Sequence, residues 1–418
     1  MAKGNEIIVG LDVGTTKICT VVGEVKPDGS VDIIGVGRAA SKGLRKGIVV
    51  NIESTVESIK SAVEHAERMA GVEIRSVNVG IAGGHIKGFN SRGVIAVKGG
   101  EISQADIDRV VEAAKAVAIP LDREMLHVIT NEFIVDGQDG VMDPRGMAGV
   151  RLEAEVHIVT GAVAAVQNLV KCCEKADLEV ADIVLEPLAS AEASLDQDEK
   201  DLGIGIVDIG GGTTDIALFH QGSICHTSVI AIGGNQFTTD LAVGLRVTMP
   251  EAERIKVEHA TTLMSNIKEN EMIRLKSALN SSTSSKRVKE VPKTYLLDII
   301  QPRTEELLNL VRREIEESVC GKMITAGIVF TGGATQLDGM LELAEDILDI
   351  PVRRAVPTGV GGLVDTVSDP RHATGVGLVL YGVKKEFANF DMRSLSEDGL
   401  FFGILNRMRS WVEGLFKF

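Results

Sequence analysis

Short apolar runs that end in glycine alternate with amphipathic stretches along the first part of this chain. Residues 7–17, 77–86 and 205–215 each begin with an apolar run and continue into a glycine turn, which predicts strands that end in tight turns. Apolar positions at helical spacing predict a helix over 51–71 and another over 162–176. With 418 residues the chain is long enough for two cores, so we expect two lobes that face a cleft.

A separate pattern interrupts the first lobe. Residues 93–97 are strand-like, 103–118 are helical, and 127–135 and 154–162 are again strand-like. A segment with its own β-α-β-β pattern is typical of a small independent unit. The sequence therefore predicts an inserted α+β domain within the first lobe.

The second half of the chain is mainly helical over residues 250–319. The polar segment NSSTSSK at 280–286 predicts an exposed loop within it. Residues 327–339 again read as a strand, a glycine turn and the start of a helix. Near the end, small residues at 374–382 predict a helix, and the polar stretch 384–399 predicts a linker.

One motif occurs twice, as IIVGLDVGTTK at 7–17 and as GIVDIGGGTTD at 205–215. In each copy an apolar run leads to an acid, Asp12 or Asp208, and then to glycines and threonines. Glycines let backbone N–H groups approach an anion, and the acid stands where a hydrated divalent cation could bridge it to phosphate. A single such turn is more often an ordinary hairpin. The duplication, with both acids at the same offset, predicts a two-sided phosphate clamp.

Composition bears on which kinds of molecule the protein can bind and on where in the cell it is expected. A net charge of -15 is unfavourable for binding nucleic acid or a bare anionic membrane, so we expect no nucleic-acid partner. The five cysteines include no CxxC pair, and the vicinal Cys172 and Cys173 are poorly placed for a bridge, which favours a reducing cytoplasm. No leader-like apolar stretch precedes the first strand, and no run has the roughly 18 apolar residues of a spanning helix. We therefore expect neither export nor a membrane-spanning segment.

The last 18 residues, 401–418, carry an amphipathic pattern. Large apolar side chains recur at helical spacing and share one face: Phe401, Ile404, Leu405, Met408, Trp411, Val412, Leu415 and Phe416. Arg407 and Arg409 flank this face, where guanidinium groups can reach lipid head groups. The pattern predicts a helix that lies in a membrane interface, and a helix docked on its own lobe is the alternative.

Five glycine-rich or small-residue segments follow one another in a fixed order. They read GLDVGTTK, LEPLASAEA, DIGGGTTD, FTGGATQLDG and ATGVGLVLYG. In order and wording they resemble the five motifs of the actin, Hsp70 and sugar-kinase ATPase superfamily. The resemblance covers essentially the whole folded body. It implies an α/β, actin-like fold of two ribonuclease-H-like lobes, with ATP and Mg²⁺ in the cleft and hinges at the second and fifth segments.

This resemblance assigns the phosphates to two loops. The residues implied are Gly14, Thr15, Thr16 and Lys17 in the first loop and Gly210, Gly211, Gly212 and Thr213 in the second. Asp12 and Asp208 would hold Mg²⁺ through water, because this small cation gives up its hydration shell reluctantly. An acid at a strand end is otherwise a solvated turn residue.

Other residues are implied around the nucleoside and the attacking water. Gly332 and Gly333 would let backbone pack on the adenosine, although turn glycines are common. Glu253 and Lys256 would reach the ribose and base, with a plain surface ion pair as the alternative. Glu186 would position the attacking water and support at most slow ATP hydrolysis. Its alternative role is a helix-start carboxylate favoured by the helix dipole.

Three further segments, at 22–37, 41–55 and 300–311, resemble in wording the FtsA family of bacterial cell-division proteins. The inserted domain and the amphipathic tail fit the same family. The resemblance implies a peripheral membrane protein that forms a polymer with itself at the septum and tethers filaments of FtsZ to the cytoplasmic face of the inner membrane. It also implies recruitment of later division proteins and binding of the FtsZ C-terminal peptide, for which Arg303 is the predicted contact.

The resemblance also implies a division of the chain. The expected units are 1–84, 161–202 and 373–384 for the first lobe, 85–160 for the inserted domain, 203–237 and 324–372 for the second-lobe core, 238–323 for a helical subdomain, 385–400 for a linker and 401–418 for the amphipathic membrane helix.

Rival classes share the ATPase motifs. An Hsp70-type chaperone would need a peptide-binding β-domain after the fifth motif, where this chain has only a linker and one helix. A sugar or acetate kinase would transfer phosphate to a small molecule. An actin-like cell-shape filament ATPase is the nearest alternative, although it typically lacks this inserted segment and this terminal helix.

Overall fold

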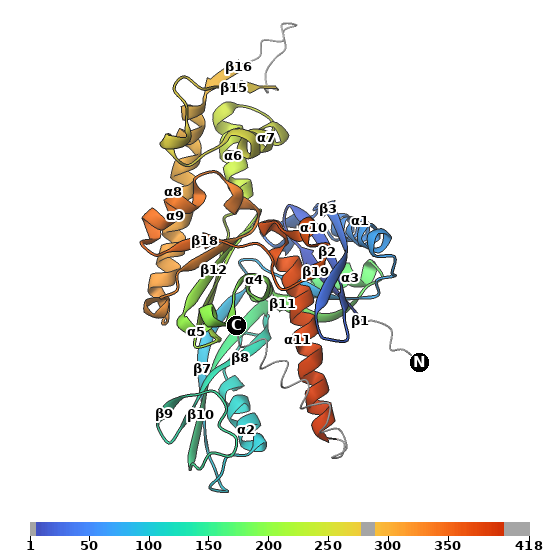
Figure 1. Ribbon diagram of the computed structural model, residues 1–418, viewed down its shortest axis with the longest axis vertical. Helices are drawn as coiled ribbons and strands as arrows, with labels where there is room; N and C mark the ends of the chain where they lie inside the picture. Colours follow the sequence, from blue (N-terminus) through green and yellow to red (C-terminus); the bar gives the residue numbers. More distant parts are fainter. Residues whose placement is uncertain (1–5, 277–288, 397–418) are drawn as a thin grey trace.

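Two sheets of related topology form the body of the molecule (Figure 1). The protein is represented by a computed structural model, which describes residues 6–276 and 289–396. In each sheet the strand that leads into a glycine loop is antiparallel to the next strand and parallel to a third. The duplicated motif therefore reflects a duplicated arrangement of strands.

The first sheet has six strands in the order β11-β6-β1-β2-β3-β19. They are β1 (Glu6–Val13), β2 (Lys17–Val25), β3 (Val31–Ala40), β6 (Ser76–Ile81), β11 (Glu179–Leu185) and β19 (Gly361–Gly362). Leu11 of β1 packs on the side of α1 (Ile52–Ala70) and α3 (Val163–Lys175), and Ile8 packs on the side of α11 (Ala373–Ser396). Because successive strand residues point to opposite faces, both faces of this sheet are covered by helices.

Helix α1 has a residue at each end that marks its limits in the sequence. The Asn51 side chain accepts a hydrogen bond from the Ser54 N–H at 2.9 Å and caps its first turn. Gly71 ends it in the left-handed conformation, with φ 71°. The predictions for α1 and α3 are confirmed to within one residue at each end.

The second sheet has five strands in the order β14-β13-β12-β17-β18. They are β12 (Ile204–Ile209), β13 (Thr214–His220), β14 (Ser223–Ile230), β17 (Ile328–Thr331) and β18 (Val352–Arg354). Two helices lie between β11 of the first sheet and β12 of the second in the sequence, α4 (Glu186–Ser194) and α5 (Gln197–Leu202). Helix α4 begins directly at the end of β11 and contacts β12 and β13, so it joins the two lobes.

A helical region stands on the second sheet. It contains α6 (Gly234–Leu245), α7 (Met249–His259), α8 (Lys293–Glu317) and α9 (Met340–Leu348). The sequence analysis missed a hairpin, β15 (Met272–Leu275) paired with β16 (Lys289–Pro292), which flanks the predicted polar loop. Its strands are only four residues long, too short for their alternation to stand out from the helical pattern around them.

The inserted domain has a sheet in the order β7-β10-β8-β9 with one helix beside it. Its elements are β7 (Lys87–Ala96), α2 (Gln104–Lys115), β8 (Arg123–Val135), β9 (Gln138–Val141) and β10 (Arg151–Ala162). The predicted pattern lacked β9, a short hairpin partner of β8. Figure 1 shows this domain at the opposite end of the molecule from the helical region.

The remaining elements are short: β4 (Leu44–Arg45), β5 (Ile48–Val49), α10 (Val364–Val367) and the 3₁₀ turns Met264–Asn266, Gly321–Met323, Gly333–Gln336 and Pro370–His372. No helix within residues 6–276 and 289–396 is long and apolar enough to cross a bilayer.

The linker predicted from residue 385 is wrong over its first part. Helix α11 continues from Ala373 to Ser396, through most of the polar stretch. The sequence between Gly382 and Gly399 contains no glycine or proline, and half of its 16 residues are of types that favour helix: two lysines, two glutamates and one each of alanine, leucine, methionine and arginine. Polarity alone was a poor indicator of a linker here. The predicted amphipathic helix at 401–418 lies outside the described residues.

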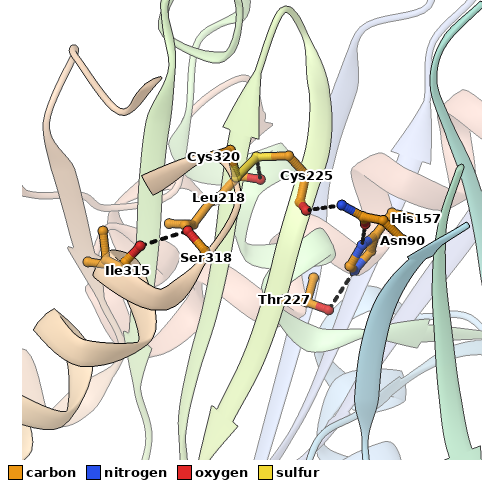
Figure 2. Close-up of a disulfide and its surroundings, with 8 residues drawn as sticks. All are labelled: Asn90, His157, Leu218, Cys225, Thr227, Ile315, Ser318 and Cys320. Carbon is orange, nitrogen blue, oxygen red and sulfur yellow. Dashed lines mark hydrogen bonds between the residues drawn. A yellow bond between two sulfur atoms is a disulfide. The ribbon is translucent and has the colours of Figure 1, made fainter. Parts of the chain in front are cut away.

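Cys225 and Cys320 form a disulfide, which the sequence analysis did not foresee (Figure 2). The two residues are 95 positions apart, with Cα atoms 6.3 Å apart, so no local spacing announced the pair. The bond connects β14 to the segment after α8. Cys172 and Cys173, which the sequence marks as poorly placed for a bridge to each other, are free, and both are buried.

Histidines lie where the inserted domain meets both lobes. His157 of β10 is 2.6 Å from Asn90 Oδ1 through Nδ1 and 2.9 Å from Thr227 Oγ1 through Nε2, which connects the domain to β14 (Figure 2). His127 of β8 accepts a hydrogen bond from the Leu185 N–H at 3.0 Å, at the end of β11. Burial lowers the pKa of each imidazole to about 4. Both contacts therefore use neutral histidine.

We expect acid to destabilise the protein through these contacts. An unfolded histidine binds a proton below about pH 6.5, whereas the folded imidazoles do so only below about pH 4, so the free energy of unfolding falls as pH decreases between these values. Each histidine should cost roughly 2 kcal/mol between pH 7 and pH 5. Urea unfolding at both pH values measures the change. His157→Gln should reduce the pH dependence, and a pH dependence equal to that of the parent protein would contradict the assignment.

Candidate functional site

A cavity of about 570 Å³ lies between the two lobes. Its walls come from the β1–β2 turn, the β12–β13 turn, the start of α4, helices α6 and α7, the turn after β17 and the start of α11. Every residue predicted to bind nucleotide or metal, or to position water, lines this one cavity: Asp12, Gly14, Thr15, Thr16, Lys17, Glu186, Asp208, Gly210, Gly211, Gly212, Thr213, Glu253, Lys256, Gly332 and Gly333. The fold thus brings together residues that are more than 300 positions apart.

The first loop places one cation beside one acid. Asp12 lies near the end of β1 and Lys17 begins β2, and the antiparallel pairing of these strands turns both side chains into the cavity. Lys17 Nζ is 3.7 Å from Asp12 Oδ2 and donates a hydrogen bond to the backbone carbonyl of Arg371. Thr15 Oγ1 accepts a hydrogen bond from the Gly47 N–H at 3.0 Å, which holds the loop against its own lobe.

The second loop touches the first one directly. A Cβ atom at Gly211 would lie 1.9 Å from Thr16 Oγ1, and one at Gly212 would lie 2.5 Å from Thr15 Oγ1. The sequence predicts that these glycines allow close approach by phosphate. The structure adds a second reason, because a side chain at either position would push the lobes apart.

Four carboxyl groups share the cavity with Lys17. Burial, together with the neighbouring Asp208, raises the pKa of Asp215 to about 8. Burial raises the pKa of Asp12 to about 6, although Lys17 opposes the shift. Burial, reinforced by the three aspartates, raises the pKa of Glu186 well above its usual range. Four acids thus face one lysine, Lys17, in this part of the cavity, while Lys256 and Arg371 lie on its outer wall and at its mouth. Added positive charge would favour the ionised forms of the acids.

Two hydroxyl groups hold Asp208 at the back of the cavity. Ser190 Oγ of α4 donates to Oδ2 at 2.7 Å, and Thr374 Oγ1 of α11 donates to the same oxygen at 3.2 Å. Burial raises the pKa of Asp208, and these two hydrogen bonds act in the opposite direction. Neither Ser190 nor Thr374 was predicted as a site residue.

Glu186 occupies the first position of α4, directly after β11. A Cβ at Gly80 would lie 3.2 Å from its Cγ, so this glycine gives the glutamate room against β6. The carboxyl group faces the cavity while its backbone begins a helix. Its position is compatible with both predicted roles, water positioning and a favourable charge at a helix start.

The outer wall of the cavity contains the predicted pair from α7. Lys256 Nζ lies 2.7 Å from Glu253 and donates hydrogen bonds to Thr238 Oγ1 at 2.8 Å and to the Gly234 carbonyl at 3.0 Å. The two charges form an ion pair and also line the cavity, so the geometry is compatible with either predicted role. The pair fixes α7 against α6.

The turn after β17 completes the wall. Gly332 has φ 88°, and a Cβ there would lie 2.3 Å from Asp208 Oδ1. A Cβ at Gly333 would lie 3.1 Å from Arg371 Cγ. Glycine is therefore needed at position 332 for its conformation and for the space beside the carboxylate.

Sequence reasoning missed several lining residues. Asp215 closes the second copy of the repeated motif, and its acidic side chain at a strand start was a usable signal. Asn235 accepts a hydrogen bond from Thr16 Oγ1 at 3.3 Å across the cleft, and no pattern marked it. Arg371 forms an ion pair with Asp369 at 2.8 Å at the mouth of the site.

Within residues 6–276 and 289–396 there is no group of three or more His, Cys, Asp or Glu side chains arranged to hold a metal ion. The arrangement offers carboxylate oxygens on one side and glycine loops with hydroxyl groups on the other. It can accommodate an anion whose charge is bridged to the carboxylates by a hydrated cation.

The other predicted residues lie elsewhere. Arg303, predicted to contact the FtsZ peptide, lies on α8 and donates from Nε to Asp240 Oδ2 at 2.6 Å, which connects α8 to α6. It also pairs with Glu306. The predicted membrane residues, Phe401, Ile404, Leu405, Met408, Trp411, Val412, Leu415 and Phe416, are outside the described ranges.

Solved structures share the fold at low sequence identity. The PilM chain of a PilM-PilN type IV pilus biogenesis complex matches with TM-score 0.66 and 17% identity over 90% of this chain and 98% of that one. MreB5 of Spiroplasma citri, in a structure bound to ADP, matches with TM-score 0.56 and 14% identity over 94% and 99%. These likenesses confirm the predicted actin-like fold.

Sequence relatives identify the family. The family model described as "SHS2 domain inserted in FTSA" matches residues 83–160, and the model "Cell division protein FtsA" matches 205–377. Cell division protein FtsA of Pseudomonas aeruginosa is 46% identical over 99% of both chains, and that of Escherichia coli K12 is 36% identical over 98% of both. The alternative of a cell-shape filament protein is therefore wrong. The chain belongs to the FtsA family of cell division proteins.

Proposed function

We propose that this protein binds ATP with Mg²⁺ between its lobes, polymerises, and tethers FtsZ filaments to the cytoplasmic membrane at the division septum. The observation that carries the nucleotide part is the single cavity in which both glycine loops meet the start of α4 and of α11. Family membership and the amphipathic pattern of residues 401–418 support the tethering part. The inserted domain would recruit later division proteins.

The residues of the cavity fit a magnesium–phosphate group. The two glycine loops would donate backbone and hydroxyl hydrogen bonds to the phosphates, and Lys17 would add a charge. Asp12 and Asp208 would hold the cation through water, since Mg²⁺ usually retains several waters beside one or two carboxylates. The excess of buried carboxyl groups supports this assignment, because the cation supplies the charge that the protein lacks. When bound, it would stabilise negative charge on the phosphates.

The nucleoside would lie between α7 and the turn after β17. Glu253 and Lys256 would face the ribose and base, and Gly332 and Gly333 would leave space for the adenosine. Lys256 is held in place by Thr238, so its ammonium group is already oriented before a ligand arrives.

Hydrolysis would be slow and would depend on Glu186. Its carboxyl group must be ionised to accept a proton from water, yet burial and three nearby aspartates favour the neutral acid. Only a site whose negative charge is offset by bound cation would hold it in the active form. Because little Glu186 would be ionised, hydrolysis would be slow and the ATP-bound state, which suits a filament, would be long-lived.

Glu186→Gln should leave ATP affinity within about twofold and reduce turnover by at least about tenfold, because the amide keeps the shape but cannot accept the proton. Isothermal titration calorimetry measures binding and a phosphate-release assay measures turnover. Glu174→Gln, an exposed change on α3, serves as the matched control. Parental turnover in Glu186→Gln would leave the residue with only its helix-start role.

The FtsZ C-terminal peptide would dock along α6 and α8. Val243 and Tyr295 are exposed apolar side chains on these helices, with exposed fractions of 73% and 43%. The Tyr295 hydroxyl donates to the Gly244 carbonyl at 3.3 Å, which places it beside the end of α6. Arg303 lies on the same pair of helices and keeps 26% of its side chain exposed, enough for a peptide carboxylate to share it with Asp240.

A charge swap separates the two roles of Arg303. Arg303→Glu should weaken peptide binding about fivefold or more, but it also breaks the ion pair with Asp240. The double change Asp240→Arg with Arg303→Glu restores an ion pair between the helices and leaves the position negative. Fluorescence anisotropy with the labelled peptide should show both variants impaired. Recovery in the double variant would show that Arg303 only supports the helices, and unchanged ATP affinity controls for folding.

The tail would act as a weak anchor that becomes effective through assembly. Its eight apolar side chains would contribute on the order of 1 kcal/mol each at an interface. Ordering the backbone as a helix costs about 1 to 2 kcal/mol per residue before hydrogen bonds offset it. One helix is therefore a reversible anchor, and a polymer that presents many of them binds by avidity.

Trp411→Glu should abolish co-sedimentation with anionic vesicles, and with it the vesicle recruitment of FtsZ filaments, because it places a charge in the middle of the apolar face. Ser410→Glu adds the same charge on the polar face and should keep most of the binding. Calorimetry should show parental ATP affinity in both. Equal sedimentation of the parent and Trp411→Glu would remove the tail from the tethering mechanism.

A further inference from the structure

Ser190 and Thr374 hold one oxygen of Asp208 from two different helices. Their hydroxyl oxygens lie 2.7 and 3.2 Å from Asp208 Oδ2 and 3.1 Å from each other. The exposed fractions are 0% for Ser190, 7% for Thr374 and 7% for Asp208. Water therefore has little access to the cluster, and the orientation of the carboxylate depends on these two donors.

The second oxygen of the same carboxylate is left for the cavity. In residues 6–276 and 289–396, no donor bonds to Asp208 Oδ1, whereas Oδ2 has two. A Cβ at Gly332 would approach Oδ1 to 2.3 Å, so glycine leaves that side open. The two oxygens thus have separate surroundings, one fixed by hydroxyl groups and one available to a ligand.

Both hydroxyl groups come from helices where the chain passes between the lobes. Helix α4 follows β11 of the first sheet and precedes β12 of the second, and α11 follows the turn at Pro370–His372 and packs on β1 (Figure 1). A Cβ at Gly377 of α11 would lie 1.7 Å from the Ala189 carbonyl of α4. The helices are in backbone contact, so a relative shift of the lobes would move Ser190 and Thr374 against each other.

We infer that Ser190 and Thr374 are positioning residues that aim Asp208 Oδ1 at the hydrated magnesium of bound MgATP and connect that contact to the hinge between the lobes. The inference rests on the proposed binding of MgATP. Thr374 itself lines the cavity, but in this proposal both hydroxyl groups act through Asp208. Each acts by fixing a carboxylate that would otherwise rotate, as outer partners of metal-binding groups commonly do.

The test is the effect of Mg²⁺ on ATP affinity, measured by calorimetry on the full chain with Mg²⁺ and with EDTA. Ser190→Ala and Thr374→Val remove a hydroxyl with little change in volume. Each should reduce the gain in affinity that Mg²⁺ provides by roughly tenfold and leave the Kd in EDTA within about twofold. Thr374→Ser, which keeps the hydroxyl, should restore the parental gain.

Ser194→Ala provides the matched control. Ser194 is also on α4 and is buried, and its hydroxyl has no hydrogen-bond partner among the described residues. Ser194→Ala removes a hydroxyl group from the same helix as Ser190→Ala does, but that hydroxyl group does not contact Asp208. The increase in ATP affinity that Mg²⁺ provides should therefore stay at the parental value. Asp208→Asn should lower the increase in ATP affinity that Mg²⁺ provides. The double variant with Asp208→Asn and Ser190→Ala should show no further decrease.

The outcomes are distinguishable. If Mg²⁺ increases ATP affinity as much in Ser190→Ala and Thr374→Val as in the parent protein, the inference is overturned and the proposed function stays intact. An equal loss of affinity with Mg²⁺ and with EDTA would overturn it as well, because it would assign the residues to the general shape of the cleft. Parent protein that binds no ATP under either condition would instead refute the proposed function, and the inference with it.

Discussion

Buried negative charge at the junction of the lobes is the constraint on which the rest of the structure depends. Each glycine hairpin directs an acid into the same cavity, Asp12 from one lobe and Asp208 from the other, and Asp215 and Glu186 add two more. Like charges in a poorly hydrated space disfavour ionisation, so their pKa values rise. Lys17 alone cannot offset them. Under the proposed function, bound Mg²⁺ would offset this negative charge.

The same junction holds the two lobes in close contact. The two glycine loops are in contact, and the helices α4 and α11 pack through backbone atoms behind them. Small residues at these places allow closure without a gap. The inserted domain is connected to both lobes, through His127 to the first and through His157 to the second. The inserted domain therefore contacts an element of each lobe, β11 through His127 and β14 through His157.

The sequence predicted the strands and the cavity well because glycine, threonine and acid follow apolar runs in a repeated order. It predicted α1 well because Asn51 and Gly71 mark its ends. It failed where the determinant is tertiary. Cys225 and Cys320 are 95 positions apart, and Asp208 is 18 positions from Ser190 and 166 from Thr374, so no local pattern announces these contacts. The linker prediction failed because polar residues can also be good helix formers.

The central claim is that the glycine loops of both lobes and the two opposed aspartates form one magnesium–nucleotide site. A crystal structure of the protein grown with Mg²⁺ and a non-hydrolysable ATP analogue tests it most directly. The account predicts phosphates between residues 14–17 and 210–213, with the hydrated metal between Asp12 and Asp208. An analogue bound outside this cavity, or a metal remote from both aspartates, would contradict the account.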